Sequence, residues 1–142
     1  MQLDELAARA VVDAAYRAWS RGDVEGVLSQ YTDDLTYWSN VGGPDGAPLT
    51  IEGKPAFRLF VEGIAATMES ASVLEQFRLT DGIGHARVEF YVRHKLTRHA
   101  LSGAYRQVTT FKNGRIVRAE QFHDAARTTA FMRLIAEQTT TG

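Results

Sequence analysis

The stretch RQVTTFKNGRIVRAEQFH, residues 106–123, decides the fold because it predicts two strands joined by a very tight turn. Asn-Gly at 113–114, flanked by alternating residues, is the strongest short hairpin signal that a sequence carries. Other alternating stretches precede it and are separated by short turns at 81–84 and 98–100. The second half of the chain is therefore expected to be an antiparallel meander. Its four strands are expected at 72–80, 85–97, 101–111 and 115–123.

In the segments before and after this meander, apolar residues recur at the spacing of an α-helix. Gly22 and Asp23 predict the end of one helix and the cap of the next, and Pro55 suits the first turn of a later one. A β-branched and aromatic strand is expected at 35–39, followed by a Gly- and Pro-rich loop up to residue 49. Helices are expected at 3–19, 24–31, 54–68 and 125–137.

Helices followed by a long meander predict the α+β class, with helices packed on one sheet face. A strongly curved antiparallel sheet packed against three or four helices forms a cone with a central pocket, where a small apolar ligand can bind. The length of 142 residues is that of one ordinary domain, so residues 1–142 are expected to form a single domain.

Composition limits the classes of function. The chain is 44% hydrophobic and 23% charged with a net charge of −1, so it is globular and offers no basic surface for nucleic acid. It has no cysteine, which excludes disulfides and thiol chemistry and is typical of a reducing compartment. No segment approaches the roughly 18–20 apolar residues of a membrane span. We expect a soluble cytoplasmic protein with no membrane or nucleic-acid partner.

Strand alternation assigns an inner face to each strand, since successive side chains point to opposite sides of a sheet. On 85–97 the inner set is the apolar row that ends at His94. On 115–123 it is the set of Val117, Ala119, Gln121 and His123, which carries no charge apart from the imidazole. Aromatic residues of the first strand and of two helices complete the wall. The expected pocket residues are Tyr16, Trp19, Tyr37, Ser39, Phe57, Phe60, Val88, Phe90, Val92, His94, Tyr105, Gln107, Ala119, Gln121 and His123.

His123 and Asp124 lie where a strand passes into a helix, and each allows two interpretations. Asp124 is either the N-cap of the last helix or a partly desolvated carboxylate that acts as a general acid or base. His123 is then a second titrating group, although neighbouring strand residues point apart. His94 is either a pocket residue or a strand-end histidine that reaches water or a backbone carbonyl. We name Asp124 and His123 as the candidate catalytic residues.

Four phrases cover nearly the whole chain: SRGDVEGVLSQYTDDLTYW (20–38), IEGKPAFRLFV (51–61), ARVEFYV (86–92) and FKNGRIVRAEQFHDAA (111–126). In order and spacing they resemble the nuclear transport factor 2-like superfamily, most closely its SnoaL-like and ketosteroid-isomerase-like branch. The resemblance implies the same cone-shaped α+β fold. It does not imply one activity, because this fold carries isomerases, cyclases, hydrolases and non-catalytic subunits.

The resemblance also places family residues on this chain. The isomerase base falls on Ser39, the acid of its oxyanion hole falls near Gln107, and its helix tyrosine falls at Ala15 or Tyr16. The tyrosine and asparagine of limonene-epoxide-hydrolase-like members are two apart, whereas Tyr37 and Asn40 are three apart. Neither catalytic set is therefore preserved. The late acidic residue of SnoaL-like cyclases has its nearest counterpart in Asp124.

Three hypotheses follow. The first is an isomerase, cyclase or hydratase that uses acid–base proton transfer on a small hydrophobic oxygenated substrate. The second is a non-catalytic protein that binds a hydrophobic ligand in the same cone. The third is a dimerisation module that uses its outer sheet face, including Tyr91 and Arg93. A homodimer through that face is expected in all three. No metal or cofactor is expected, because the four histidines lack ligand spacing and no nucleotide fingerprint occurs.

Overall fold

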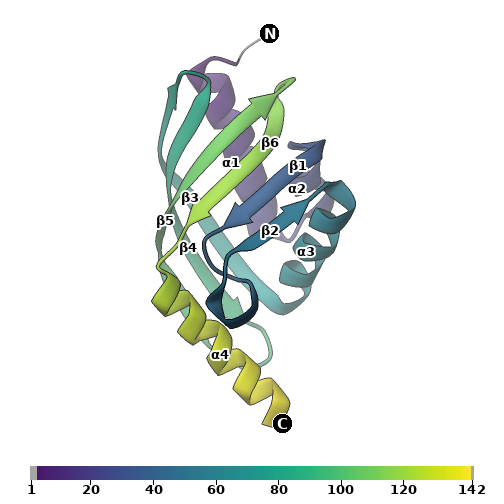
Figure 1. Ribbon diagram of the computed structural model, residues 1–142, viewed down its shortest axis with the longest axis vertical. Coiled ribbons are helices and arrows are strands. Elements are labelled where there is room, and N and C mark those ends of the chain that lie inside the picture. The colour runs from purple at the N-terminus through teal and green to yellow at the C-terminus, as the bar shows by residue number, and fades with distance from the viewer. Residues whose placement is uncertain (1–2, 142) are drawn as a thin grey trace.

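The computed structural model describes residues 3–141, and within them six strands form one curved sheet in the order β2-β1-β6-β5-β4-β3 (Figure 1). This arrangement confirms the expected α+β cone. The elements are α1 (Glu5–Arg21), α2 (Val24–Leu28), β1 (Tyr31–Ser39), η1 (Pro44–Gly46), β2 (Leu49–Glu52), α3 (Lys54–Thr67), β3 (Met68–Thr80), β4 (Ile83–His94), β5 (Ala100–Lys112), β6 (Arg115–Phe122) and α4 (Ala125–Thr141).

The predicted meander is confirmed, since β3, β4, β5 and β6 pair antiparallel in sequence order. Asn113 and Gly114 both adopt positive φ, as the two-residue turn requires, and Asp81 with Gly82 repeats this turn between β3 and β4. β4 ends at His94 rather than at 97, because the chain turns there and the Thr97 N–H donates to His94 Nδ1 at 3.2 Å.

The sequence prediction was wrong at the other end of the sheet. No strand was expected between the loop that ends at residue 49 and the helix at 54, but residues 49–52 form β2, which pairs antiparallel with β1. The strand has only four residues and follows a stretch rich in Gly and Pro, so its own pattern was too short to detect. β1 begins at Tyr31 rather than at 35. It pairs in parallel with β6, whereas the other strand pairs of the sheet are antiparallel.

The alternation of β6 is broken near its start. Ile116 is fully buried and Val117 is only half-buried, which is the reverse of the predicted inner set, whereas Ala119 and Gln121 are buried as expected. The cause is an irregularity in the pairing of β5 with β6 between Thr110 and Phe111. Such a bulge shifts the side chains that precede it to the other face.

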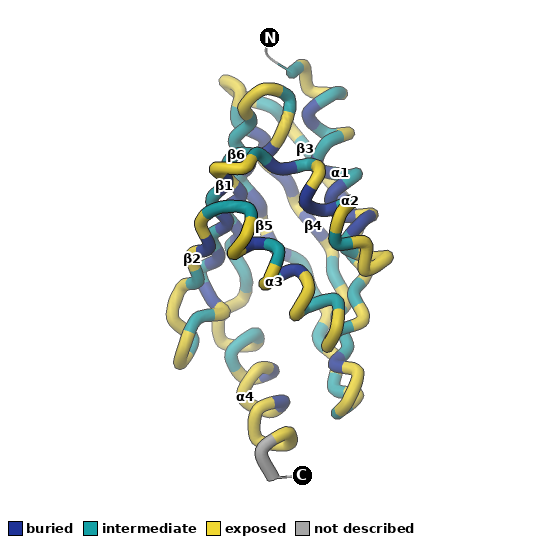
Figure 2. The backbone as a smooth tube through the Cα atoms, turned by 90° about the vertical axis from the view of Figure 1, so that its right-hand side faces the viewer, coloured by how far each residue is buried: buried dark blue, intermediate teal, exposed yellow. Residues whose placement is uncertain are grey.

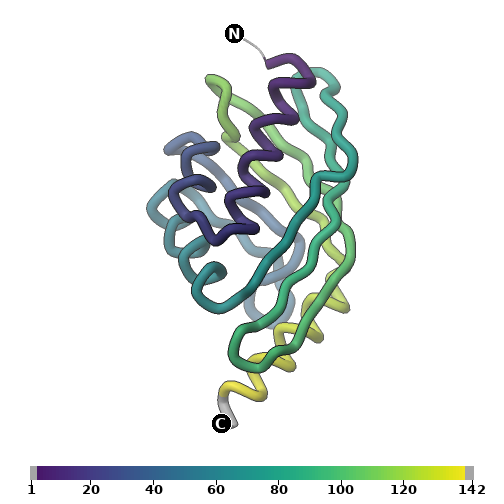
Figure 3. The backbone as a smooth tube through the Cα atoms, turned by 180° about the vertical axis from the view of Figure 1, so that it is seen from behind, coloured from purple at the N-terminus to yellow at the C-terminus, as the bar shows by residue number. Residues whose placement is uncertain are grey.

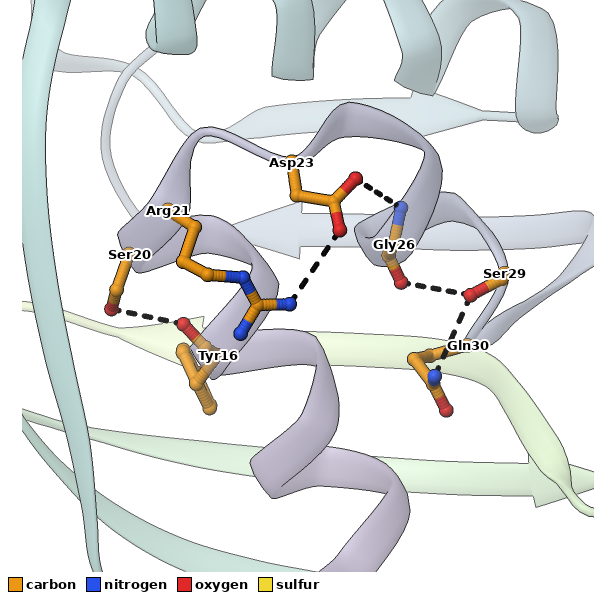
Figure 4. A network of polar contacts seen from close by, with 7 residues as sticks. All are labelled: Tyr16, Ser20, Arg21, Asp23, Gly26, Ser29 and Gln30. Carbon is orange, nitrogen blue, oxygen red and sulfur yellow. Dashed lines mark hydrogen bonds and ion pairs between the residues drawn. The ribbon is translucent and has the colours of Figure 1, made fainter.

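The corner between α1 and α2 follows the predicted capping chemistry (Figure 4). Gly22 has φ of 66°, and its N–H is directed at the carbonyl oxygens of the last turn of α1. Asp23 accepts a hydrogen bond from the Gly26 N–H at 2.9 Å and lies 3.5 Å from the guanidinium of Arg21. Ser20 then joins this corner to the sheet, because its hydroxyl accepts from the Ser72 N–H of β3.

α1 crosses one face of the sheet and α3 lies beside it (Figures 1 and 3). Buried positions gather on α1 and on the strands it covers, whereas α4 projects from one end of the sheet and is mostly exposed (Figure 2). Among the described side chains of α4, only Phe131 and Ile135 are buried. In the described part of the chain, none of the helices is both long enough and apolar enough to cross a membrane.

Candidate functional site

A cavity of about 230 Å³ lies on the inner face of the sheet, between the C-terminal half of α1, α3 and the first turns of α4. All four walls contribute side chains, and most of these are apolar or aromatic. The expected pocket residues that line it are Tyr16, Trp19, Tyr37, Ser39, Phe60, Phe90, Val92, Tyr105, Gln121 and His123.

The remaining expected residues lie elsewhere. Phe57, Val88 and Ala119 have no exposed surface and belong to the core beneath the cavity. Gln107 is 2% exposed and lies behind the tyrosines. The structure therefore does not bring these four side chains to the cavity surface, although strand alternation gave Val88, Gln107 and Ala119 the correct face.

His94 is buried at the far end of β4 and does not line the cavity. Its Nδ1 lies 3.0 Å from the Thr97 hydroxyl and accepts from the Thr97 N–H. The ring therefore holds the turn between β4 and β5. Of the two interpretations of His94, the geometry agrees with the strand-end one, with a side chain and a backbone N–H as partners.

A network of neutral polar groups forms the floor of the cavity. Tyr105 donates its hydroxyl proton to the Tyr16 hydroxyl at 2.8 Å, and Tyr16 donates to Gln107 Oε1. Tyr37 donates to Gln121 Oε1 at 2.9 Å, and Gln121 Nε2 donates to Gln107 Oε1 at the same distance. The two glutamine carbonyls thus accept the hydroxyl protons of Tyr16 and Tyr37, and Tyr16 accepts that of Tyr105, which satisfies polar groups that would be costly to bury alone.

Burial keeps these tyrosines protonated. It is the main cause that raises the pKa of Tyr16, Tyr37 and Tyr105 above the ordinary value; the neighbouring phenol of Tyr105 raises the pKa of Tyr16 further, whereas the hydrogen bond to Tyr16 partly offsets the rise at Tyr105. A phenol that stays neutral remains a hydrogen-bond donor at every physiological pH. The network is therefore fixed in its protonation state and holds no charge.

His123 is the titratable imidazole on the cavity wall. Burial lowers the pKa of His123 to about 4, so the ring is neutral at pH 7. Its Nε2 lies 2.9 Å from Gln121 Oε1, which can only accept, so the proton is on Nε2 and Nδ1 is an acceptor. Tyr105 stacks beside the ring at 4.2 Å between centroids, and Phe90 meets it edge-on at 5.9 Å.

Asn40 fixes the backbone of His123 through two hydrogen bonds. The His123 N–H donates to Asn40 Oδ1 at 2.8 Å, and Asn40 Nδ2 donates to the His123 carbonyl at 3.0 Å. The backbone N–H of Asn40 donates to the Gln121 carbonyl, which is the last backbone bond between the ends of β1 and β6. The side-chain amide of Asn40 then extends this pairing by one residue, to His123. Sequence reasoning considered Asn40 only as a family catalytic residue and missed this role.

Asp124 points away from the cavity. Its carboxylate accepts from the Arg127 N–H at 3.1 Å, its carbonyl accepts from the Thr128 N–H, and the residue is exposed. This is N-cap geometry for α4. His123 and Asp124 therefore point to different surroundings and do not form a pair.

Sequence reasoning missed part of the lining. α4 contributes Thr128, Phe131 and Met132, and the segment between β1 and α3 contributes Val41 and Leu49. The apolar spacing of 125–137 predicted a packed helix but could not show what it packs against. Within the residues that the structure describes, no three His, Asp or Glu side chains gather into a metal-binding set.

Comparison with known proteins identifies the fold. A family model described as a SnoaL-like domain matches residues 12–119. An epoxide hydrolase from M. tuberculosis that is LEH-like superposes with a TM-score of 0.75 at 15% identity, covering 97% of this chain and 98% of its own. An NTF2-like protein of unknown function from Burkholderia pseudomallei gives 0.74 at 20% identity, covering 88% and 96%.

A third structure, TerC co-crystallised with polyporic acid, superposes with a TM-score of 0.73 at 19% identity, covering 92% of this chain and 98% of its own. At such identities the likeness establishes the fold alone. No curated protein sequence matches the chain.

Proposed function

The chain belongs to the family of SnoaL-like domains, and from this premise we propose that it binds a small, neutral, mostly apolar molecule with an oxygen function in the cavity beside His123. The nuclear transport factor 2-like fold and the cavity are its basis. The identity of the ligand is not part of the proposal beyond this chemical class.

One observation carries the proposal: within the described residues, no Asp, Glu, Lys or Arg lines the cavity. A buried charge needs a partner charge or several hydrogen bonds, and without them its burial costs several kcal/mol. A charged ligand would find neither on these walls. A neutral ring or short chain would instead contact Trp19, Phe60 and Phe90, and its burial would contribute about 25 cal/mol per Å² of apolar area.

His123 gives the ligand its orientation. Because Nε2 donates to Gln121, the Nδ1 lone pair is the acceptor that His123 can offer to a ligand hydroxyl. The hydroxyl of Ser39 lines the same cavity and accepts only a long bond, 3.3 Å, from the Val41 N–H, so it can donate to a ligand carbonyl.

Proton transfer on the bound molecule is a second candidate, favoured by the titratable imidazole in an apolar cavity. In an isomerase, cyclase or hydratase of this kind, Nδ1 of His123 would take the proton. A pKa of about 4 makes this imidazole a weak base at neutral pH, so we place binding first. Asp124 acts in this proposal as a helix cap, because its carboxylate points away from the cavity.

The test uses three probes of the same size: 2-naphthol, naphthalene and 2-naphthoate. We expect 2-naphthol to bind, naphthalene to bind about fivefold more weakly for lack of one hydrogen bond worth about 1 kcal/mol, and 2-naphthoate not to bind. Val92→Phe should abolish binding by filling the cavity. Leu59→Phe is the control, because Leu59 is 71% exposed on α3 and does not line the cavity. Calorimetric titration measures the three probes on the wild type and 2-naphthol on each of the two variants.

Two further variants separate the roles of the neighbouring residues. His123→Phe should reduce 2-naphthol to the affinity of naphthalene, whereas Asp124→Asn should leave binding unchanged because asparagine also caps helices. Equal binding of 2-naphthoate and 2-naphthol, or binding that survives Val92→Phe, would refute the proposal. Loss of binding in Asp124→Asn would show that the Asp124 carboxylate takes part in ligand binding.

We also propose that the protein is cytoplasmic and forms a homodimer through the outer face of its sheet. Tyr91 is 40% exposed and Val73 63% exposed on this face. Trp38 and Phe122 stack there at 5.3 Å, and the guanidinium of Arg106 lies 4.9 Å from the Phe122 ring. Aromatic and arginine side chains are enriched in protein interfaces, which supports a second copy as the partner.

A further inference from the structure

A second cavity, of about 210 Å³, opens at the C-terminal end of α1. It lies between the C-terminal turns of α1 and α3 and the first residues of β3. Its rim carries the Arg21–Asp23 pair of the α1–α2 corner (Figure 4) and Lys95, whose ammonium donates to the Ala65 carbonyl at 2.9 Å. Since these polar groups already have protein partners, the half-buried apolar side chains of α3, Ile64 and Ala65, are part of the surface that the second cavity offers.

The two cavities share a wall. Trp19, Ile64, Met68 and Ser70 line both of them, and all four are half-buried. These side chains border both spaces, which are nearly equal in volume, and we take them as the wall between the two cavities.

Met68 is the side chain of this wall whose removal would open it most easily. Trp19 is held by edge contacts to Phe57 and Phe60 at 6.4 and 6.2 Å, and it packs against the core. Met68 sits where α3 passes into β3, and its backbone is fixed because its N–H donates to the Ile64 carbonyl and it pairs with His94. Its side chain is unbranched and adapts to irregular space.

We propose that Met68 closes the ligand cavity at this end and is the residue that sets the maximum length of the bound molecule. The inference rests on the proposed function, since it specifies which neutral molecules the cavity accepts. Short molecules fit on the His123 side of the wall. Longer ones meet the Met68 side chain, and the second cavity behind it would hold their distal ends once the wall is shortened.

The experiment measures the affinity of straight-chain primary alcohols, from butan-1-ol to dodecan-1-ol, by displacement of 2-naphthol. In the wild type, affinity should rise roughly fourfold per methylene and then stop rising at a limiting length. Met68→Ala should move this limit by several carbons, because it joins two cavities of similar size. Met68→Val should move it in the same direction by less, and it serves if the alanine variant does not fold.

Two variants control for side effects. Met132→Ala makes the same substitution in the wall that α4 contributes, which borders the first cavity alone, so it should weaken every alcohol alike and leave the limiting length in place. Ala65 lines only the second cavity, so the double variant Met68→Ala/Ala65→Phe should refill the opened space and restore the wild-type limit.

The outcomes are distinct. A longer limit in Met68→Ala that Ala65→Phe reverses supports the inference. An unchanged limit in both Met68 variants, with short alcohols still bound, overturns it and leaves the proposed function intact. Failure of all alcohols and of 2-naphthol to bind the wild type overturns the proposed function and this inference together.

Discussion

His123 is costly to charge, because its imidazole lies among aromatic rings in a cavity without carboxylates. Burial lowers the pKa of His123 from 6.5 to about 4, so between these values the unfolded chain binds more protons than the folded one. Stability attributable to this residue is complete above pH 6.5 and is lost as the pH falls toward 4. At about 1.4 kcal/mol per pKa unit the loss is on the order of 3 kcal/mol.

We therefore expect the free energy of unfolding to fall by about this amount more in the wild type than in His123→Gln between pH 7 and pH 4. Urea unfolding at several pH values measures the difference. His85→Gln, which removes an exposed imidazole from β4, should follow the wild type. Parallel pH profiles for wild type and His123→Gln would contradict the assignment of a buried neutral ring.

For single residues, the sequence predicted which face of the sheet a side chain occupies, but not whether other side chains cover it. Alternation placed Tyr37, Tyr105 and Gln121 on the inner face, and all three line the cavity. It also placed Gln107 and Val88 there, but these are covered by other side chains. Which inward residue is covered depends on packing between distant segments, and no local pattern carries that information.

Asn40 joins two elements, because its amide binds the backbone of His123 at the point where β6 gives way to α4. We expect Asn40→Ala to lower the free energy of unfolding by about 1–3 kcal/mol, since it leaves two backbone groups without their partner. Asn40→Asp keeps the acceptor for the His123 N–H and loses the donor to the His123 carbonyl. Its loss of unfolding free energy should therefore lie between zero and that of Asn40→Ala.

Hydrogen exchange of the His123 amide gives the readout that is specific to this contact. Exchange should accelerate in Asn40→Ala and stay slow in Asn40→Asp. Equal protection in both variants would mean that the strand end is held by its other contacts and that Asn40 contributes little.

The elements themselves were predicted best where their partners are close in the sequence. The turns at 81–84 and 112–114 are local, so β3 to β6 were found in the right order. β2 was missed because it has only four residues and follows a stretch rich in Gly and Pro, and β1 was begun too late because its parallel partner, β6, lies far along the chain. The bulge at Thr110 and Phe111 is likewise a property of two strands together.

The proposed homodimer is tested on the whole molecule. Tyr91→Asp places a charge on the outer sheet face, and we expect it to convert the dimer to a monomer, because a buried unpaired charge disfavours an interface. Leu59→Asp introduces the same charge at a leucine that is 71% exposed on α3 and should leave the dimer intact. Sedimentation over a hundredfold range of concentration gives the masses. A monomeric wild type would refute the proposal.

The parallel pairing of β1 with β6 determines when the sheet can be completed during synthesis. Tyr37 and its partner Gln121 are 84 positions apart, and everything between them must leave the ribosome first. At about 5–20 residues per second, β1 waits roughly 4 to 17 seconds for its neighbour, with only the four-residue β2 beside it. During that interval its open edge is available to other chains, so the nascent protein is exposed to aggregation at β1 until β6 has emerged and paired with it.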